Sequence, residues 1–164
     1  MKTLDLTQTL ASMLIARDWK IALAESCTGG LVCATLTELA GSSEWFERGY
    51  ITYSNEAKTE CLGVSAELIE SLGAVSEEVA VAMASGAQQA SGANVAISIT
   101  GIAGPSGGSA EKPVGTVCFG WAIQNSSAES RLISKTMHFD GDRSVIREQA
   151  KDYALAELIA LLRN

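Results

Sequence analysis

The chain has 164 residues, of which 47% are hydrophobic and 19% charged, and this composition predicts one folded domain over residues 1–164. A net charge of −7 excludes the basic surface that non-specific nucleic-acid binding requires, so we expect no nucleic-acid partner. The four cysteines form no C-x-x-C pair and there is one histidine, which argues against a structural zinc site. We expect neither a metal nor a cofactor.

The predicted elements begin with an N-terminal helix. Leu6, Leu10, Met13 and Leu14 keep helical spacing, which predicts an amphipathic helix over residues 4–17. Its apolar run is short and has charged neighbours, so we expect neither a signal peptide nor a membrane span. We therefore expect a cytoplasmic protein with reduced thiols and no membrane partner.

Strand and helix patterns then alternate along the chain. Further helices are predicted over 31–39, from about 57, over 76–90 and over 143–162. Strands are predicted over 20–24, 49–53, 94–100, 114–123 and 131–139, the last two forming an antiparallel pair with a turn at 125–127. This order predicts an α/β fold in which helices cover both faces of a mixed sheet.

The junction between the first strand and the second helix carries the strongest chemical signal. Residues 25–30 read Glu-Ser-Cys-Thr-Gly-Gly, which places Ser26, Cys27 and Thr28 at a helix N-terminus. A hydroxyl beside unpaired amides is what acyl transfer needs, because the amides can hold a developing oxyanion. The alternative is an N-capped helix whose glycines allow close packing.

A serine nucleophile needs a base, and the only histidine is a weak candidate. His138 lies in a strand pattern, where a packing or surface role is more common than catalysis. A neutral lysine in a desolvated pocket can serve instead, and Lys58 is the leading candidate, with Tyr53 to relay or orient the proton. The alternatives are a solvated helix lysine and a strand tyrosine with a satisfied hydroxyl.

Two further loops follow strand ends and can converge on the same site. Residues 101–112 form a glycine-containing loop whose amides can cradle a phosphate, although a plain long loop is as compatible with the sequence. Arg143 and Arg147 share one face at the start of the last helix, against the helix dipole. A bound anion explains this placement, and an exposed pair beside acidic neighbours explains it equally well.

Six segments together resemble the C-terminal domain of the competence/damage-inducible protein CinA, in the same order and over almost the whole chain. They are AESCTGG (24–30), TYSNEAK (52–58), GAVSE (73–77), TGIAGP (100–105), KPVGTV (112–117) and FDGDR (139–143). The resemblance implies a three-layer α/β/α sandwich. It also implies metal-free hydrolysis of nicotinamide mononucleotide to nicotinate mononucleotide and ammonia, in pyridine-nucleotide recycling.

The resemblance also implies roles for individual residues. Ser26 is expected to be the nucleophile, Lys58 the base and Tyr53 a proton-relay partner. The amides of Thr28, Gly29 and Gly30 are expected to form the oxyanion site. The residues expected to hold the substrate are Asn55, Thr100, Gly101, Ala103, Gly104, Arg143 and Arg147.

Two other functions stay open at this point. One is a non-catalytic member of the same family that binds a nucleotide and regulates a partner. The other is a different amidase or a phosphatase, for which Cys27 offers a nucleophile. A homodimer or another homo-oligomer is expected from the small, alanine-rich domain.

Overall fold

A computed structural model describes residues 2–125 and 129–164 and has one five-stranded sheet at its centre. The strands are β1 (Ile21–Glu25), β2 (Phe46–Ile51), β3 (Val95–Gly101), β4 (Thr116–Gln124) and β5 (Ser130–His138), in the spatial order β2-β1-β3-β4-β5. β1 pairs in parallel with β2 and β3, whereas β4 pairs antiparallel with β3 and β5. The sheet is therefore mixed, as the sequence predicts.

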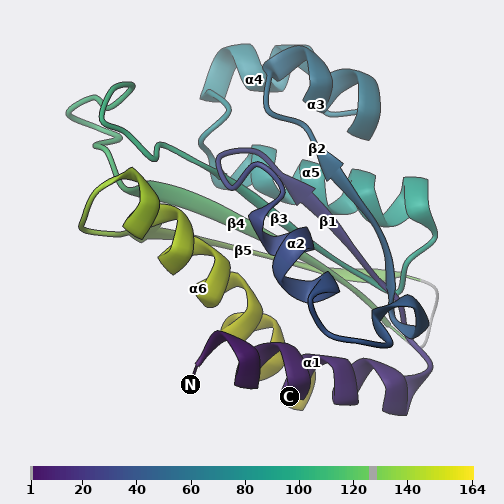
Figure 1. Cartoon of the computed structure of the whole chain (residues 1–164). Coiled ribbons are helices and arrows are strands. Elements are labelled where there is room, and N and C mark those ends of the chain that lie inside the picture. The colour runs from purple at the N-terminus through teal and green to yellow at the C-terminus, as the bar shows by residue number, and fades with distance from the viewer. Residues whose placement is uncertain (1, 126–128) are drawn as a thin grey trace.

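Helices cover both faces of this sheet (Figure 1). α1 (Thr3–Arg17), α2 (Leu31–Thr37) and α6 (Arg143–Arg163) lie on one face. α5 (Glu77–Ser91) lies on the other face, with α3 (Asn55–Leu62) and α4 (Ala66–Leu72) packed beside it. The predicted α/β class and three-layer arrangement are confirmed.

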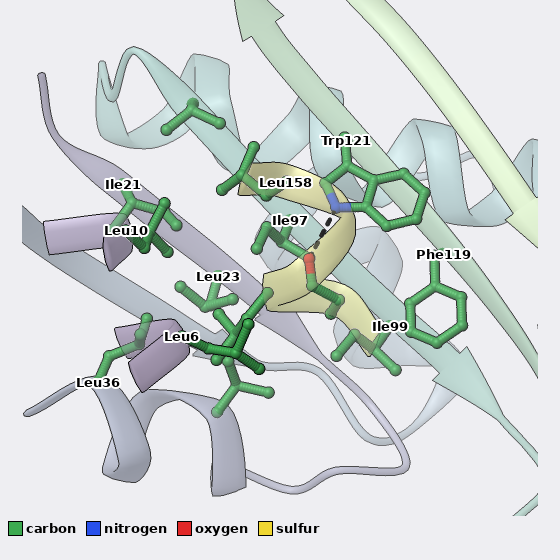
Figure 2. Packing of buried hydrophobic residues seen from close by; sticks show 14 of the residues in the cluster. Leu6, Leu10, Ile21, Leu23, Leu36, Ile97, Ile99, Phe119, Trp121 and Leu158 are labelled. Carbon is green, nitrogen blue, oxygen red and sulfur yellow. Dashed lines mark hydrogen bonds between the residues drawn. The ribbon is translucent and has the colours of Figure 1, made fainter. Parts of the chain in front are cut away.

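The side chains of the strands explain why the two faces differ. Ile21, Leu23 and Ile97 point into the large core under α1 and α6, shown in Figure 2. In that core the Trp121 indole nitrogen donates a hydrogen bond to the carbonyl of Ala154 on α6, 3.2 Å away. The burial of these large side chains is the main stabilising contribution on this face.

The opposite face carries small residues, and α5 approaches the strands closely there. Ala22, Ala24 and Ala96 face this helix, and Ser98 on β3 donates a hydrogen bond to the Ala80 carbonyl on α5. A Cβ atom added at Gly120 on β4 would lie 2.4 Å from the same carbonyl oxygen. Glycine at position 120 is therefore required by packing.

The structure differs from the predicted elements most clearly at α4 and β2. Helix α4 was not predicted, because its seven residues are too short to show a helical period, although Ser65 accepts a hydrogen bond from the Leu68 amide and caps it. Strand β2 covers 46–51, whereas the sequence predicts 49–53, because Phe46 and its neighbours pair with β1. The predicted turn at 125–127 includes Ser126 and Ser127, which lie outside the described residues.

Candidate active site

The carboxyl ends of β1 and β3, the segment after β2 and the start of α6 meet at one end of the molecule, opposite the chain termini (Figure 1). They enclose a cavity of about 290 Å³, near the lower end of the range for small-molecule sites. Its lining consists of Ser26, Cys27, Tyr53, Asn55, Lys58, Ala74, Val75, Thr100, Gly101, Ile102, Ala103, Gly104, Ser106, Gly107 and Arg143. Ligands of open α/β sheets bind at this position.

A serine and a lysine lie in direct contact inside the cavity. The Lys58 Nζ atom is 2.9 Å from Ser26 Oγ, 2.8 Å from the Thr52 carbonyl oxygen and 3.1 Å from that of Tyr53. Ser26 follows β1 directly, and its amide donates a hydrogen bond to the Ile99 carbonyl on β3. The position of Ser26 is thus fixed by the two central parallel strands.

Local capping places the lysine. The Ser54 hydroxyl accepts a hydrogen bond from the Ala57 amide and starts α3, so that Lys58 lies one turn into the helix. Long side chains on helices point back toward the N-terminal turn. The Lys58 side chain therefore reaches the Thr52 and Tyr53 carbonyls and the end of β1.

Burial shifts the Lys58 amine toward its neutral form. The residue is 1% exposed, and this desolvation lowers the pKa of its amine from the usual value of 10.5. A neutral amine has two N–H donors and one lone pair. The two nearest carbonyls can take the donors, which leaves the lone pair for the Ser26 hydroxyl proton.

The amides of Gly29 and Gly30, which the sequence analysis expects to form the oxyanion site, are hydrogen-bonded to protein acceptors. The Gly29 amide donates to the Ser26 carbonyl, and the fully buried Glu25 carboxylate accepts from the amides of Gly30, Val32 and Cys33. Glu25 therefore caps α2 and occupies its N-terminal donors. The sequence pattern cannot show that the residue before the nucleophile turns back to bind the helix start.

The amides of Cys27 and Thr28 are the free donors of this loop. Within residues 2–125 and 129–164, neither amide donates a hydrogen bond to a protein acceptor. Cys27 lines the cavity next to Ser26, whereas Thr28 is fully buried behind it. The amide of the residue after the nucleophile is also a donor in the nucleophile elbow of α/β-hydrolases.

The two predicted substrate-binding arginines have different positions. Arg143 lines the cavity, where its Nη1 donates to the Gly104 carbonyl at 2.8 Å and its Nη2 to the Tyr53 hydroxyl at 3.2 Å. Arg147 is not part of the lining, and its guanidinium donates to the carbonyls of Cys27 and Thr28 at 3.1 and 2.9 Å. These contacts give no support to the expectation that Arg147 holds the substrate. These protein acceptors explain both cations without a bound anion.

Tyr53 contacts Ser26 and Lys58 through its backbone carbonyl. Its carbonyl accepts from Lys58 Nζ, and it lies 3.4 Å from Ser26 Oγ. Its side chain is 60% exposed, and in the described part of the chain its hydroxyl has one hydrogen bond, from Arg143. The contacts thus give no support to a proton relay through the hydroxyl.

The comparisons with known proteins identify the family of this chain. The family model for the CinA C-terminal domain matches residues 3–162. The chain belongs to the CinA C-terminal domain family. The nicotinamide-nucleotide amidohydrolase PncC of Escherichia coli strain K12 is 50% identical over 155 residues, which cover 94% of this chain and 92% of that protein. The PncC protein of Enterobacter agglomerans is 50% identical over 151 residues, covering 92% and 90% of the two chains.

Solved structures of the family have the same fold. The competence damage-inducible protein A from Klebsiella pneumoniae superposes with a TM-score of 0.94 at 39% identity, covering 100% of this chain and 99% of that one. The competence/damage inducible protein CihA from Agrobacterium tumefaciens gives a TM-score of 0.91 at 42% identity, with 98% and 94% covered.

The CinA-family fold brings further residues into the cavity to which the sequence analysis gave no individual role. Ala74 and Val75 belong to the GAVSE segment and come from the connection between α4 and α5, and the Thr100 hydroxyl donates to the Ala74 carbonyl at 3.0 Å. Ser106 and Gly107 join them from the loop after β3, the loop that the sequence indicates as a possible phosphate cradle. Small apolar side chains carry no chemical signal, so only the fold shows that Ala74 and Val75 line the site.

Other groups contribute less to the chemistry of this family member. Cys27 is buried, and burial raises the pKa of its thiol to about 11, so the thiol stays protonated near neutral pH and is a poor nucleophile. His138 lines a larger hollow of about 900 Å³ between α5 and the β4–β5 pair, which contains neither Ser26 nor Lys58. In the part of the chain described, no three His, Cys, Asp or Glu side chains gather as a metal site would require.

Proposed function

We propose that this chain is a nicotinamide-nucleotide amidase, which hydrolyses the carboxamide of nicotinamide mononucleotide to a carboxylate and releases ammonia. The observation that carries the proposal is the buried Lys58 amine 2.9 Å from the Ser26 hydroxyl. The 50% identity to proteins named nicotinamide-nucleotide amidohydrolase supports the choice of substrate.

In the first step Ser26 attacks the carboxamide carbon. The neutral Lys58 amine accepts the hydroxyl proton as the new C–O bond forms, and the carbonyl oxygen becomes an oxyanion. The positively charged pyridinium ring draws electrons from the carboxamide and makes its carbon easier to attack. Lys58 ends this step as an ammonium ion that donates to the Thr52 and Tyr53 carbonyls.

The oxyanion needs hydrogen-bond donors that the protein has not already used. Within the described residues the Cys27 amide meets this condition at the cavity lining, whereas the amides of Gly29 and Gly30 are already bonded. Fixed donors of this kind contribute on the order of a hundredfold or more each to the rate. We assign the oxyanion site to the Cys27 amide.

The intermediate then collapses. The Lys58 ammonium gives its proton to the leaving nitrogen, the C–N bond breaks and ammonia departs. Lys58 is neutral again and takes a proton from water, which attacks the acyl-serine. Breaking the acyl C–O bond, with the proton returned to Ser26 Oγ, restores the enzyme.

The remaining lining residues are proposed to hold the nucleotide. Besides Lys58, Arg143 is the basic residue in the cavity lining. Two of its five N–H donors have protein partners in the described ranges. Ser106 and Gly107 line the same cavity, and within residues 2–125 and 129–164 their amides donate to no protein acceptor. We place the phosphate at these groups and the ribose near Asn55, Thr100, Gly101 and Ala103.

Assembly and location stay predictions. A homodimer or other homo-oligomer and a cytoplasmic location are expected from the sequence. No helix in the described residues has both the length and the apolar character needed to span a bilayer.

The decisive experiment measures ammonia release from nicotinamide mononucleotide by the wild type in EDTA, beside Ser26→Ala. The expected result is wild-type turnover and an inactive, folded variant. Wild-type turnover that EDTA abolishes would contradict the metal-free mechanism. Binding without turnover by the wild type would instead support the regulatory function.

A further inference from the structure

The loop that follows the nucleophile is held between two charged side chains from opposite directions. The Glu25 carboxylate accepts from three amides at the start of α2. On the other side, the Arg147 guanidinium donates to the carbonyls of Cys27 and Thr28. The amides at the start of α2 are thus bonded to Glu25. In the described residues, the amides of Cys27 and Thr28 donate to no protein acceptor.

Peptide planarity links the Arg147 contact to the amide of Cys27, the lining residue next to Ser26. The Cys27 N–H and the Ser26 carbonyl belong to one peptide unit and point in opposite directions, and the Gly29 amide holds that carbonyl at 3.0 Å. Arg147 Nε holds the next carbonyl, that of Cys27, at 3.1 Å. Both peptide units that flank Cys27 are therefore fixed, and with them the direction of its N–H.

Arg147 lies on a turn of α6 that packs against the main core. Arg147 follows Ile146, which is buried in the main core with Ala150 and Ala154 of the same helix. The guanidinium spans two consecutive carbonyls, and its planar geometry fits such a pair, whereas a lysine ammonium lacks this fixed fork. A Cβ atom added at Gly29 would lie 3.7 Å from Arg147 Nη2, so the loop and the side chain are in contact.

We propose that Arg147 is a positioning residue that holds the loop so that the Cys27 amide is oriented as an oxyanion donor, and that it makes no contact with the substrate. This inference rests on the proposed amidase function. It predicts an effect on turnover, whereas a phosphate-binding arginine affects substrate affinity.

The test compares Arg147→Gln with Arg143→Gln. For Arg147→Gln we expect kcat to fall about a hundredfold, the magnitude of one lost oxyanion donor, with KM within about threefold of the wild type. In a Ser26→Ala background, titration with nicotinamide mononucleotide is expected to give the same Kd with and without Arg147→Gln. Arg143→Gln is expected to weaken that Kd.

A weaker Kd with unchanged kcat in Arg147→Gln would overturn the proposal, and so would an unchanged kcat and Kd. If Arg147→Gln does not fold, Arg147→Lys keeps the charge, and a roughly tenfold fall in kcat at constant Kd is expected because the ammonium cannot span both carbonyls. Failure of the amidase function would appear already in the wild type as absent ammonia. The two failures are therefore distinguishable.

Discussion

The two sides of the cavity are built differently. One side, here the catalytic wall, consists of Ser26 and Lys58, which are 8% and 1% exposed. The other, the binding rim, consists of Tyr53, Asn55 and Arg143, which are all exposed. The wall is fixed by strand pairing and backbone hydrogen bonds, whereas the rim is held by side-chain contacts such as the one between Arg143 and the Tyr53 hydroxyl.

This difference has a chemical reason. A lysine acts as a base only when its amine is neutral, and burial provides this by disfavouring the ammonium form. A charged phosphate is costly to bury, and an exposed rim binds it with less desolvation. Changes in the wall are therefore expected to lower kcat, and changes in the rim to raise KM.

The largest effect is expected from Lys58→Arg. Arginine stays protonated and cannot accept the Ser26 proton, so kcat should fall by about a thousandfold or more. Steady-state ammonia release measures this. Lys20→Arg is the matched control. Lys20 precedes β1, at the opposite end of this strand from Ser26, and the variant should keep wild-type activity. A Lys58→Arg variant with more than a tenth of wild-type kcat would exclude Lys58 as the base.

At the rim, Arg143→Gln should lower kcat/KM by about 10- to 100-fold, the range for a lost hydrogen bond to a charged group, mainly through KM. Arg131→Gln serves as control, because Arg131 lies on β5 and donates to the Leu161 carbonyl. Initial rates over a range of substrate concentrations separate the two constants. A fall in kcat with an unchanged KM would contradict the binding role of Arg143 and the proposed difference between wall and rim.

The pH dependence tests the protonation state of the wall. Neutral Lys58 is the active form, so kcat/KM should rise about tenfold per pH unit below its pKa and level off above it. Because burial lowers this pKa, the plateau should begin below pH 10.5. Rates measured at substrate concentrations well below KM, where most of the enzyme is free, give the midpoint of this pH profile. A midpoint at or above 10.5 would show that the lysine is not desolvated.

The smallest effect is expected from Tyr53→Phe. It removes the hydroxyl that Arg143 contacts but leaves the carbonyl that accepts from Lys58. We expect less than about a fivefold change in kcat, since a proton relay would contribute about 100-fold or more. Single-turnover measurements on the purified variant provide the check. A hundredfold loss in kcat would restore the relay role expected from the family resemblance.

Much of the fold and several site residues are readable from the sequence. The helical spacing of Leu6, Leu10 and Leu14 and the apolar strands are local patterns, and they predicted nearly all elements. The pairing of Ser26 with Lys58 was also expected, and the 2.9 Å contact agrees with it. A hydroxyl after a strand and a lysine one turn after a serine cap are recognisable without knowing their distance.

The hydrogen-bond partners of the charged side chains could not be predicted from the sequence. Arg143 and Arg147 are alike in the sequence, yet one lines the cavity and the other holds the nucleophile loop. Glu25 adjoins Ser26, but its carboxylate turns to the start of α2, and within the described residues the amides of Cys27 and Thr28 donate to no protein acceptor.

The sequence by itself determined the order of the elements, the mixed α/β architecture and the presence of a serine and a lysine suited to amide hydrolysis, because these follow from local periodicity and residue chemistry. Only the tertiary structure decided which donors are free and which are bonded. Such partners can be far apart in the chain, as Arg147 and Cys27 are by 120 positions. Packing of α6 on the core brings them together, and no local pattern encodes that contact.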